Sequence, residues 1–118
     1  MPHQPRRILI VDDDQEVLIA LERTLEGEGY NTVTAWSAKE ALALSENSQF
    51  DLLLVDEHMS DLDVEALFSE LTRKQPKAFR FLMQTRKEAP QLPSFTDIAV
   101  CKWEHGAMKA AIRDCLSA

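Results

Sequence analysis

Glycine is scarce in this sequence, with three residues among 118: Gly27, Gly29 and Gly106. They form no glycine-rich loop that could cradle a phosphate chain, which argues against a nucleotide-binding enzyme. Cysteine is equally scarce. Cys101 and Cys115 have no Cys or His neighbour at metal-ligand spacing, so neither a disulfide framework nor a thiolate metal site is indicated. We interpret both thiols as small buried hydrophobic groups.

Basic residues and long apolar runs are also lacking. Thirteen Lys and Arg face 20 Asp and Glu, giving a formal charge of −7. Binding to nucleic acid or to an anionic membrane needs a basic face, so we expect neither partner. Runs such as residues 8–11 and 52–55 are too short to span a bilayer, and no apolar stretch of signal-peptide length is present. We expect one cytoplasmic domain over residues 1–118.

Apolar runs of strand length alternate with segments of helical period, a pattern typical of βα units on a parallel sheet. The expected strands lie at residues 8–11, 31–36, 52–55, 79–84 and 98–101. The expected helices lie at residues 15–28, 37 to about 45, 64 to a point before Pro76, and 106–116. We therefore predict an α/β fold of three layers, with a doubly wound five-stranded parallel sheet in the middle.

One segment, residues 86–97, interrupts this alternation where a fourth helix is expected between two strands. Pro90 and Pro93 lie three residues apart, and the segment has little apolar periodicity. Both features disfavour a regular helix. We predict that this fourth helix is short or absent.

Capping signals mark the helix ends. Asp14 follows the first strand and is a candidate N-cap. Ser37 and Glu40 form the spacing of a capping box. Gly27 and Gly29 give the first helix a C-terminal stop.

Polar residues follow the strands at the edge where parallel sheets bind ligands. In the common strand order 2-1-3-4-5, the first and third strands are neighbours at the switch point. Asp12 and Asp13 then lie near Asp56. At ~4 Å and an effective dielectric of about 20, each like-charged pair costs on the order of 4 kcal/mol. Such a cluster needs a shared proton or a cation, and Mg²⁺ suits oxygen ligands. The alternative is that these acids only cap the next helix.

Thr85 and Lys102 follow the fourth and fifth strands. A hydroxyl and an ammonium that face a metal-bound carboxylate are the groups a phosphoryl group requires. The set therefore points to Asp56 as a nucleophile that forms an acyl phosphate.

Over residues from about 6 to 116, the chain resembles the receiver domain of two-component response regulators, the CheY-like family. The matching residues are Ile8–Asp13, Leu54–Met59, Thr85 and Lys102. The resemblance implies a signalling domain that is not a conventional enzyme. It also implies Mg²⁺ as cofactor, and a histidine kinase or phosphotransfer protein as phosphoryl donor. The possible output partners are an effector domain or a second copy of the chain.

The resemblance also implies a role for each site residue. Asp56 is the phosphoacceptor, and Asp13 and Asp56 supply the metal carboxylates. Asp12 holds a metal-bound water, and the backbone carbonyl of His58 is a further metal ligand. Thr85 supplies the switch hydroxyl, and Lys102 the ammonium that pairs with the phosphate.

Several features depart from the family pattern: Ser60, Asp61 and Val64 lie in the loop after the acceptor, the connection from Thr85 to Lys102 is shorter than usual, and three further positions concern the output face. Trp103 stands where a proline usually follows the lysine through a cis bond. A non-proline cis bond costs ~3 kcal/mol, so we expect a trans bond and a repositioned Lys102. Ala99 replaces the usual switch aromatic, and Arg86 replaces a small residue and could crowd the site. These departures predict an atypical output face.

Two alternatives stay open. The first is a pseudo-receiver that serves as a phosphorylation-independent docking or dimerisation module. The second is a Mg²⁺-dependent phosphohydrolase, which requires a second aspartate two residues after the nucleophile. His58 occupies that position after Asp56, which disfavours the hydrolase.

Overall fold

The computed structural model describes residues 4–86 and 92–117. Its strands are β1 (Arg7–Val11), β2 (Asn31–Ala35), β3 (Leu52–Asp56), β4 (Phe79–Gln84) and β5 (Ile98–Cys101). Its helices are α1 (Gln15–Glu26), α2 (Ala38–Asn47), α3 (Val64–Lys74) and α4 (His105–Leu116). Each predicted element is present, with ends that differ by up to two residues. Among the described residues, no helix is long and apolar enough to cross a membrane.

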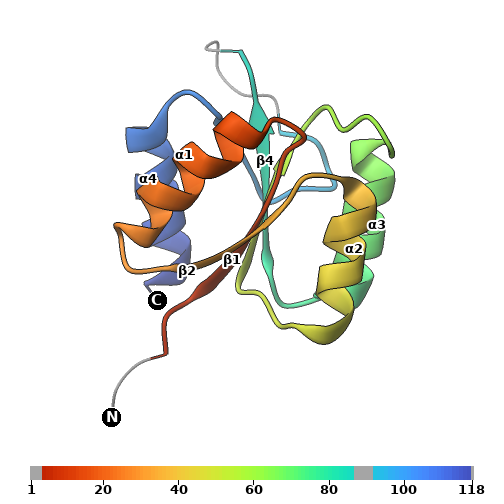
Figure 1. Ribbon diagram of the computed structural model, residues 1–118, viewed down its shortest axis with the longest axis horizontal. Coiled ribbons are helices and arrows are strands. Elements are labelled where there is room, and N and C mark those ends of the chain that lie inside the picture. Colours follow the sequence, from red (N-terminus) through yellow and green to blue (C-terminus); the bar gives the residue numbers. More distant parts are fainter. Residues whose placement is uncertain (1–3, 87–91, 118) are drawn as a thin grey trace.

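The five strands form one parallel sheet in the order β2-β1-β3-β4-β5. Helices α1 and α4 cover one face, and α2 and α3 cover the other (Figure 1). Alternate residues of β1 divide between the two cores: Ile8 and Ile10 face α1 and α4, whereas Leu9 and Val11 face α2 and α3. The predicted three-layer fold is confirmed, and the continuous apolar runs are buried on both faces.

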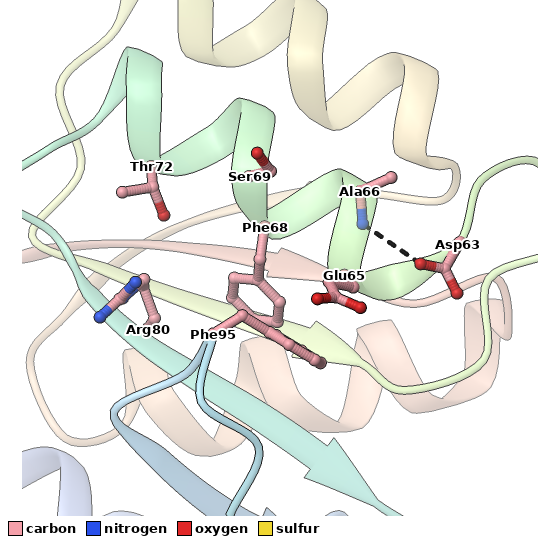
Figure 2. Close-up of a pocket in the computed structure, with 8 residues that line it drawn as sticks. All are labelled: Asp63, Glu65, Ala66, Phe68, Ser69, Thr72, Arg80 and Phe95. Atoms are coloured by element: carbon pink, nitrogen blue, oxygen red, sulfur yellow. Dashed lines mark hydrogen bonds between the residues drawn. The ribbon is translucent and has the colours of Figure 1, made fainter.

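Between β4 and β5, residues 86 and 92–97 form no helix, and residues 87–91 of the predicted loop lie outside the described part. Phe95 packs on Phe68 of α3 (Figure 2). The two ring centroids are 5.7 Å apart. The carboxylate of Asp97 pairs with the Arg80 guanidinium at 2.9 Å. A short loop therefore takes the place of a helix over these described residues.

The predicted helix caps are present with one difference. The Asp14 carboxylate accepts from the backbone N–H of Glu16 at 2.9 Å, and Ser37 Oγ accepts from that of Glu40 at 3.0 Å. The Glu40 carboxylate returns to the backbone N–H of Trp36, one residue earlier than a capping box requires. The Trp36 indole N–H also donates to this carboxylate, at 2.7 Å, which draws the side chain towards the earlier residue.

Candidate functional site

The carboxyl ends of β1 and β3 bring Asp12, Asp13 and Asp56 together. One carboxylate oxygen from each lies within 4.8 Å of the others. The parallel register pairs Val11 with Val55, so Asp12 and Asp56 are the next residues on adjacent strands. Asp12 and Asp56 are buried, whereas Asp13 is exposed. The structure thus forms an acidic cluster that is open to solvent on the Asp13 side.

Lys102 joins this cluster from the end of β5. Its Nζ lies 2.8 Å from Asp12 Oδ2 and 3.1 Å from Asp56 Oδ1, and the side chain is only 7% exposed. Its backbone N–H donates to the Gln84 carbonyl at 2.8 Å, which fixes its start beside β4. No described peptide bond is cis, so the bond to Trp103 is trans as expected. With this trans bond, the long Lys102 side chain reaches both carboxylates.

Burial and charge shift the pKa of two of these groups. Burial raises the pKa of Asp56, the Asp12 charge adds to this rise, and Lys102 and the His58 backbone N–H oppose it. Burial alone lowers the pKa of Lys102, but the carboxylates of Asp12 and Asp56 more than offset this, so the net shift is upward. The lysine therefore stays an ammonium. Burial and the neighbouring Asp12 charge make the ionised form of Asp56 less favourable than in water.

The described residues fit a hard divalent cation. Asp12 Oδ2 is buried and accepts no hydrogen bond of acceptable geometry from the described part of the chain. The Lys102 ammonium lies 2.8 Å from this oxygen. Three ionised carboxylates against one ammonium leave two negative charges uncompensated. An all-oxygen donor set with this excess charge suits Mg²⁺.

Thr85 contacts a carboxylate of the protein itself. Its backbone N–H lies 3.1 Å and its Oγ1 3.5 Å from Glu57 Oε2. Sequence reasoning missed Glu57 as a site residue. The signal was available: Asp56 pairs with Met83 in the β3–β4 register, so Glu57 and Thr85 both lie just beyond that pair.

The other predicted positions lie around the cluster. The His58 side chain is 78% exposed, with Nε2 3.7 Å from Glu57 Oε2. Arg86 is exposed, and Ala99 is half-buried beside Leu82. The Trp103 ring is half-exposed and lies 5.3 Å from Lys102 Nζ, within cation–π range. Trp103 thus contacts the lysine from the solvent side.

The sequence matches the family described as "Response regulator receiver domain" over residues 8–99. This match covers well over half of the chain, and the chain therefore belongs to that family: it is a receiver domain of the two-component system. The match ends before Lys102, so the place of the lysine in the site rests on the geometry above.

Two curated relatives show how far the similarity extends. The transcriptional regulatory protein GlrR of Escherichia coli (strain K12) is 40% identical over 76 residues, which cover 64% of this chain and 17% of that protein. The alginate biosynthesis transcriptional regulatory protein AlgB of Pseudomonas aeruginosa is 34% identical over 112 residues, covering 92% of this chain and 23% of that protein. The chain thus spans less than a quarter of the length of either relative.

Solved structures give the same fold. A CheY-like receiver domain protein from Methanospirillum hungatei JF-1 superposes with a TM-score of 0.86 at 28% identity, over 97% of this chain and 95% of that one. The response regulator TrrA from Thermotoga maritima, solved in complex with Mg(2+)-BeF, superposes with a TM-score of 0.83 at 26% identity. That match covers 94% of this chain and 99% of that one.

Proposed function

We propose that this receiver domain accepts a phosphoryl group on Asp56 in the presence of Mg²⁺ and relays it as a conformational change. One observation carries the proposal: a buried carboxylate lies within one cluster with Asp12 and Asp13 and 3.1 Å from the Lys102 ammonium. The likeness to TrrA, which was solved with Mg(2+)-BeF, supports the same assignment.

The residues divide the reaction between them. A carboxylate oxygen of Asp56 attacks the phosphorus of a phosphohistidine. The phosphorus–nitrogen bond breaks, its electron pair leaves with the imidazole, and an acyl phosphate forms. Asp12, Asp13 and Asp56 would hold Mg²⁺, with the His58 carbonyl as a further ligand. When bound, Mg²⁺ neutralises part of the phosphoryl charge.

Lys102 supplies a positive charge on the protein side. Its ammonium pairs with Asp56 in the unmodified domain and is then in place to pair with a phosphoryl oxygen. The domain acts on its own aspartate and needs no separate substrate pocket. We therefore propose a signalling domain whose catalysis extends at most to its own phosphorylation and dephosphorylation.

Two observations weigh on the alternative of a pseudo-receiver. Ala99, Trp103 and the short β4–β5 connection are compatible with a phosphorylation-independent docking or dimerisation module. An acidic cluster with two uncompensated charges costs stability in the metal-free domain, and phosphorylation gives it a role that docking does not require. The cluster favours the phosphorylated receiver, and the departures favour an altered output face.

The proposed partners follow from the proposed chemistry. A histidine kinase or a phosphotransfer protein supplies the phosphoryl group in the cytoplasm. The output passes to an effector domain or a second copy of the chain. The acidic charge of −7 argues against direct contact of this domain with nucleic acid or a membrane.

Intact mass spectrometry tests the proposal. The protein is incubated with acetyl phosphate with and without Mg²⁺, beside an Asp56→Asn control. We expect one phosphoryl adduct on the wild type, only with Mg²⁺, and none on the control. A wild type that binds Mg²⁺ but gains no adduct would support the pseudo-receiver instead.

A further inference from the structure

A single carboxylate oxygen of Glu57 contacts both donors of Thr85. Oε2 lies 3.1 Å from the backbone nitrogen and 3.5 Å from Oγ1. The hydroxyl of Thr85 therefore faces an anion that belongs to the protein itself.

The position of Glu57 is fixed by the sheet. Its backbone N–H donates to the Met83 carbonyl at 3.0 Å, which extends the β3–β4 pairing one residue beyond Asp56. Its side chain is 16% exposed, whereas Thr85 is exposed. The acceptor is thus anchored and largely buried, and the threonine is the more accessible partner of the pair.

A threonine hydroxyl has one proton and donates one hydrogen bond at a time. We propose that Glu57 is a latch: it holds the Thr85 hydroxyl in the unphosphorylated domain and competes for it with a phosphoryl group on Asp56. This inference rests on the function proposed above. Glu57 then acts as a positioning residue, and the strength of its bond to Thr85 sets how readily the domain adopts its phosphorylated state.

The latch also identifies where the change is transmitted. Ala99 supplies no aromatic ring that could follow the threonine. When Thr85 leaves Glu57 Oε2, that oxygen keeps the exposed His58 ring as its neighbour at 3.7 Å. Release of the latch would therefore change the surroundings of Glu57 Oε2, next to the exposed His58.

A double-mutant cycle tests the competition. Beryllofluoride with Mg²⁺ serves as the phosphoryl mimic, and its affinity is measured by NMR titration for the wild type, Glu57→Gln, Thr85→Ala and the double variant. Glu57→Gln keeps the shape but replaces a charge-assisted bond by a weaker neutral one. We expect Glu57→Gln to bind the mimic about tenfold more tightly when Thr85 is present, and to change the affinity less than about twofold in the Thr85→Ala background.

Two results would overturn the latch. Equal tightening in both backgrounds would show that Glu57 acts through its charge alone, and no tightening in either would show no competition. Thr85→Ser keeps the hydroxyl, so it must restore the response to Glu57→Gln.

A readout on the free protein separates the latch from the proposed function. Without Mg²⁺ or mimic, Glu57→Gln should speed hydrogen exchange of the Thr85 amide several-fold, whereas Glu65→Gln on exposed α3 should leave it unchanged. An unchanged Thr85 amide overturns the latch. If the amide responds but the wild type binds no beryllofluoride, the proposed function fails, and the regulatory role of Glu57 fails with it.

Discussion

Lys102 Nζ lies 2.8 Å from Asp12 Oδ2, and both side chains are almost fully buried. The same ammonium lies 3.1 Å from Asp56 Oδ1, so one cation serves two buried carboxylates. A bound divalent cation would relieve this shortage of positive charge, which links the stability of the fold to its signalling chemistry.

Lys102→Met should destabilise the metal-free domain by about 3 kcal/mol, because it leaves two buried carboxylates without their cation. Urea unfolding in EDTA measures this change. Lys77→Met, at an exposed position, is the matched control and should change the free energy of unfolding by less than about 0.5 kcal/mol. Equal effects of the two substitutions would refute the role of the buried pair.

Asp56→Asn should stabilise the metal-free domain at neutral pH. Burial and the Asp12 charge raise the pKa of Asp56, so the folded state binds this proton more tightly than the unfolded state. The contribution of Asp56 to the free energy of unfolding should therefore fall as the pH rises above about 3.9, through the folded-state pKa. Urea midpoints of both proteins across this range test the sign. A difference between them that does not grow with pH would contradict it.

Mg²⁺ should stabilise the wild type by about 2.7 kcal/mol at a hundredfold excess over its Kd. Asp13→Asn should weaken this effect, because Asp13 contributes a carboxylate oxygen to the cluster. Asp14→Asn is the matched control, since Asp14 caps α1 and asparagine also caps. Thermal unfolding with and without Mg²⁺ distinguishes them, and equal loss in both variants would speak against the assigned site.

Trp103→Ala should cost about 0.5–1 kcal/mol of stability through loss of the cation–π contact with Lys102. In the Lys102→Met background the same substitution should cost clearly less, since the cation is gone. Urea unfolding of the four proteins gives this coupling. If the effects of the two substitutions on the free energy of unfolding were strictly additive, the Trp103 ring and the Lys102 ammonium would not interact.

Phe95→Ala should lower the free energy of unfolding by about 1–2 kcal/mol, because the half-buried Phe95 ring packs on Phe68. Leu92→Ala in the same loop should be nearly neutral, since Leu92 is 61% exposed. Thermal or urea unfolding checks the contrast. A neutral Phe95→Ala would show that this packing does not stabilise the loop.

The sequence was sufficient to predict the sheet and the meeting of Asp12 with Asp56, because parallel strands end at one edge and the apolar runs locate those ends. It was not sufficient for the contact between Thr85 and Glu57, because strand patterns do not say which neighbouring acceptor a rotatable side chain chooses. The meeting of Lys102 with Asp56 was also predictable, because Lys102 follows the fifth strand at the same edge of the sheet, and its long side chain reaches the carboxylate through a trans bond to Trp103.

The most direct test of phosphorylation at Asp56 is to locate the modified residue. After treatment with acetyl phosphate and Mg²⁺, borohydride reduces an aspartyl phosphate to homoserine, and peptide mass spectrometry identifies its position. We predict homoserine at position 56 alone, and only when Mg²⁺ was present. Unmodified Asp56, or homoserine at Asp13 instead, would contradict the proposed phosphoacceptor.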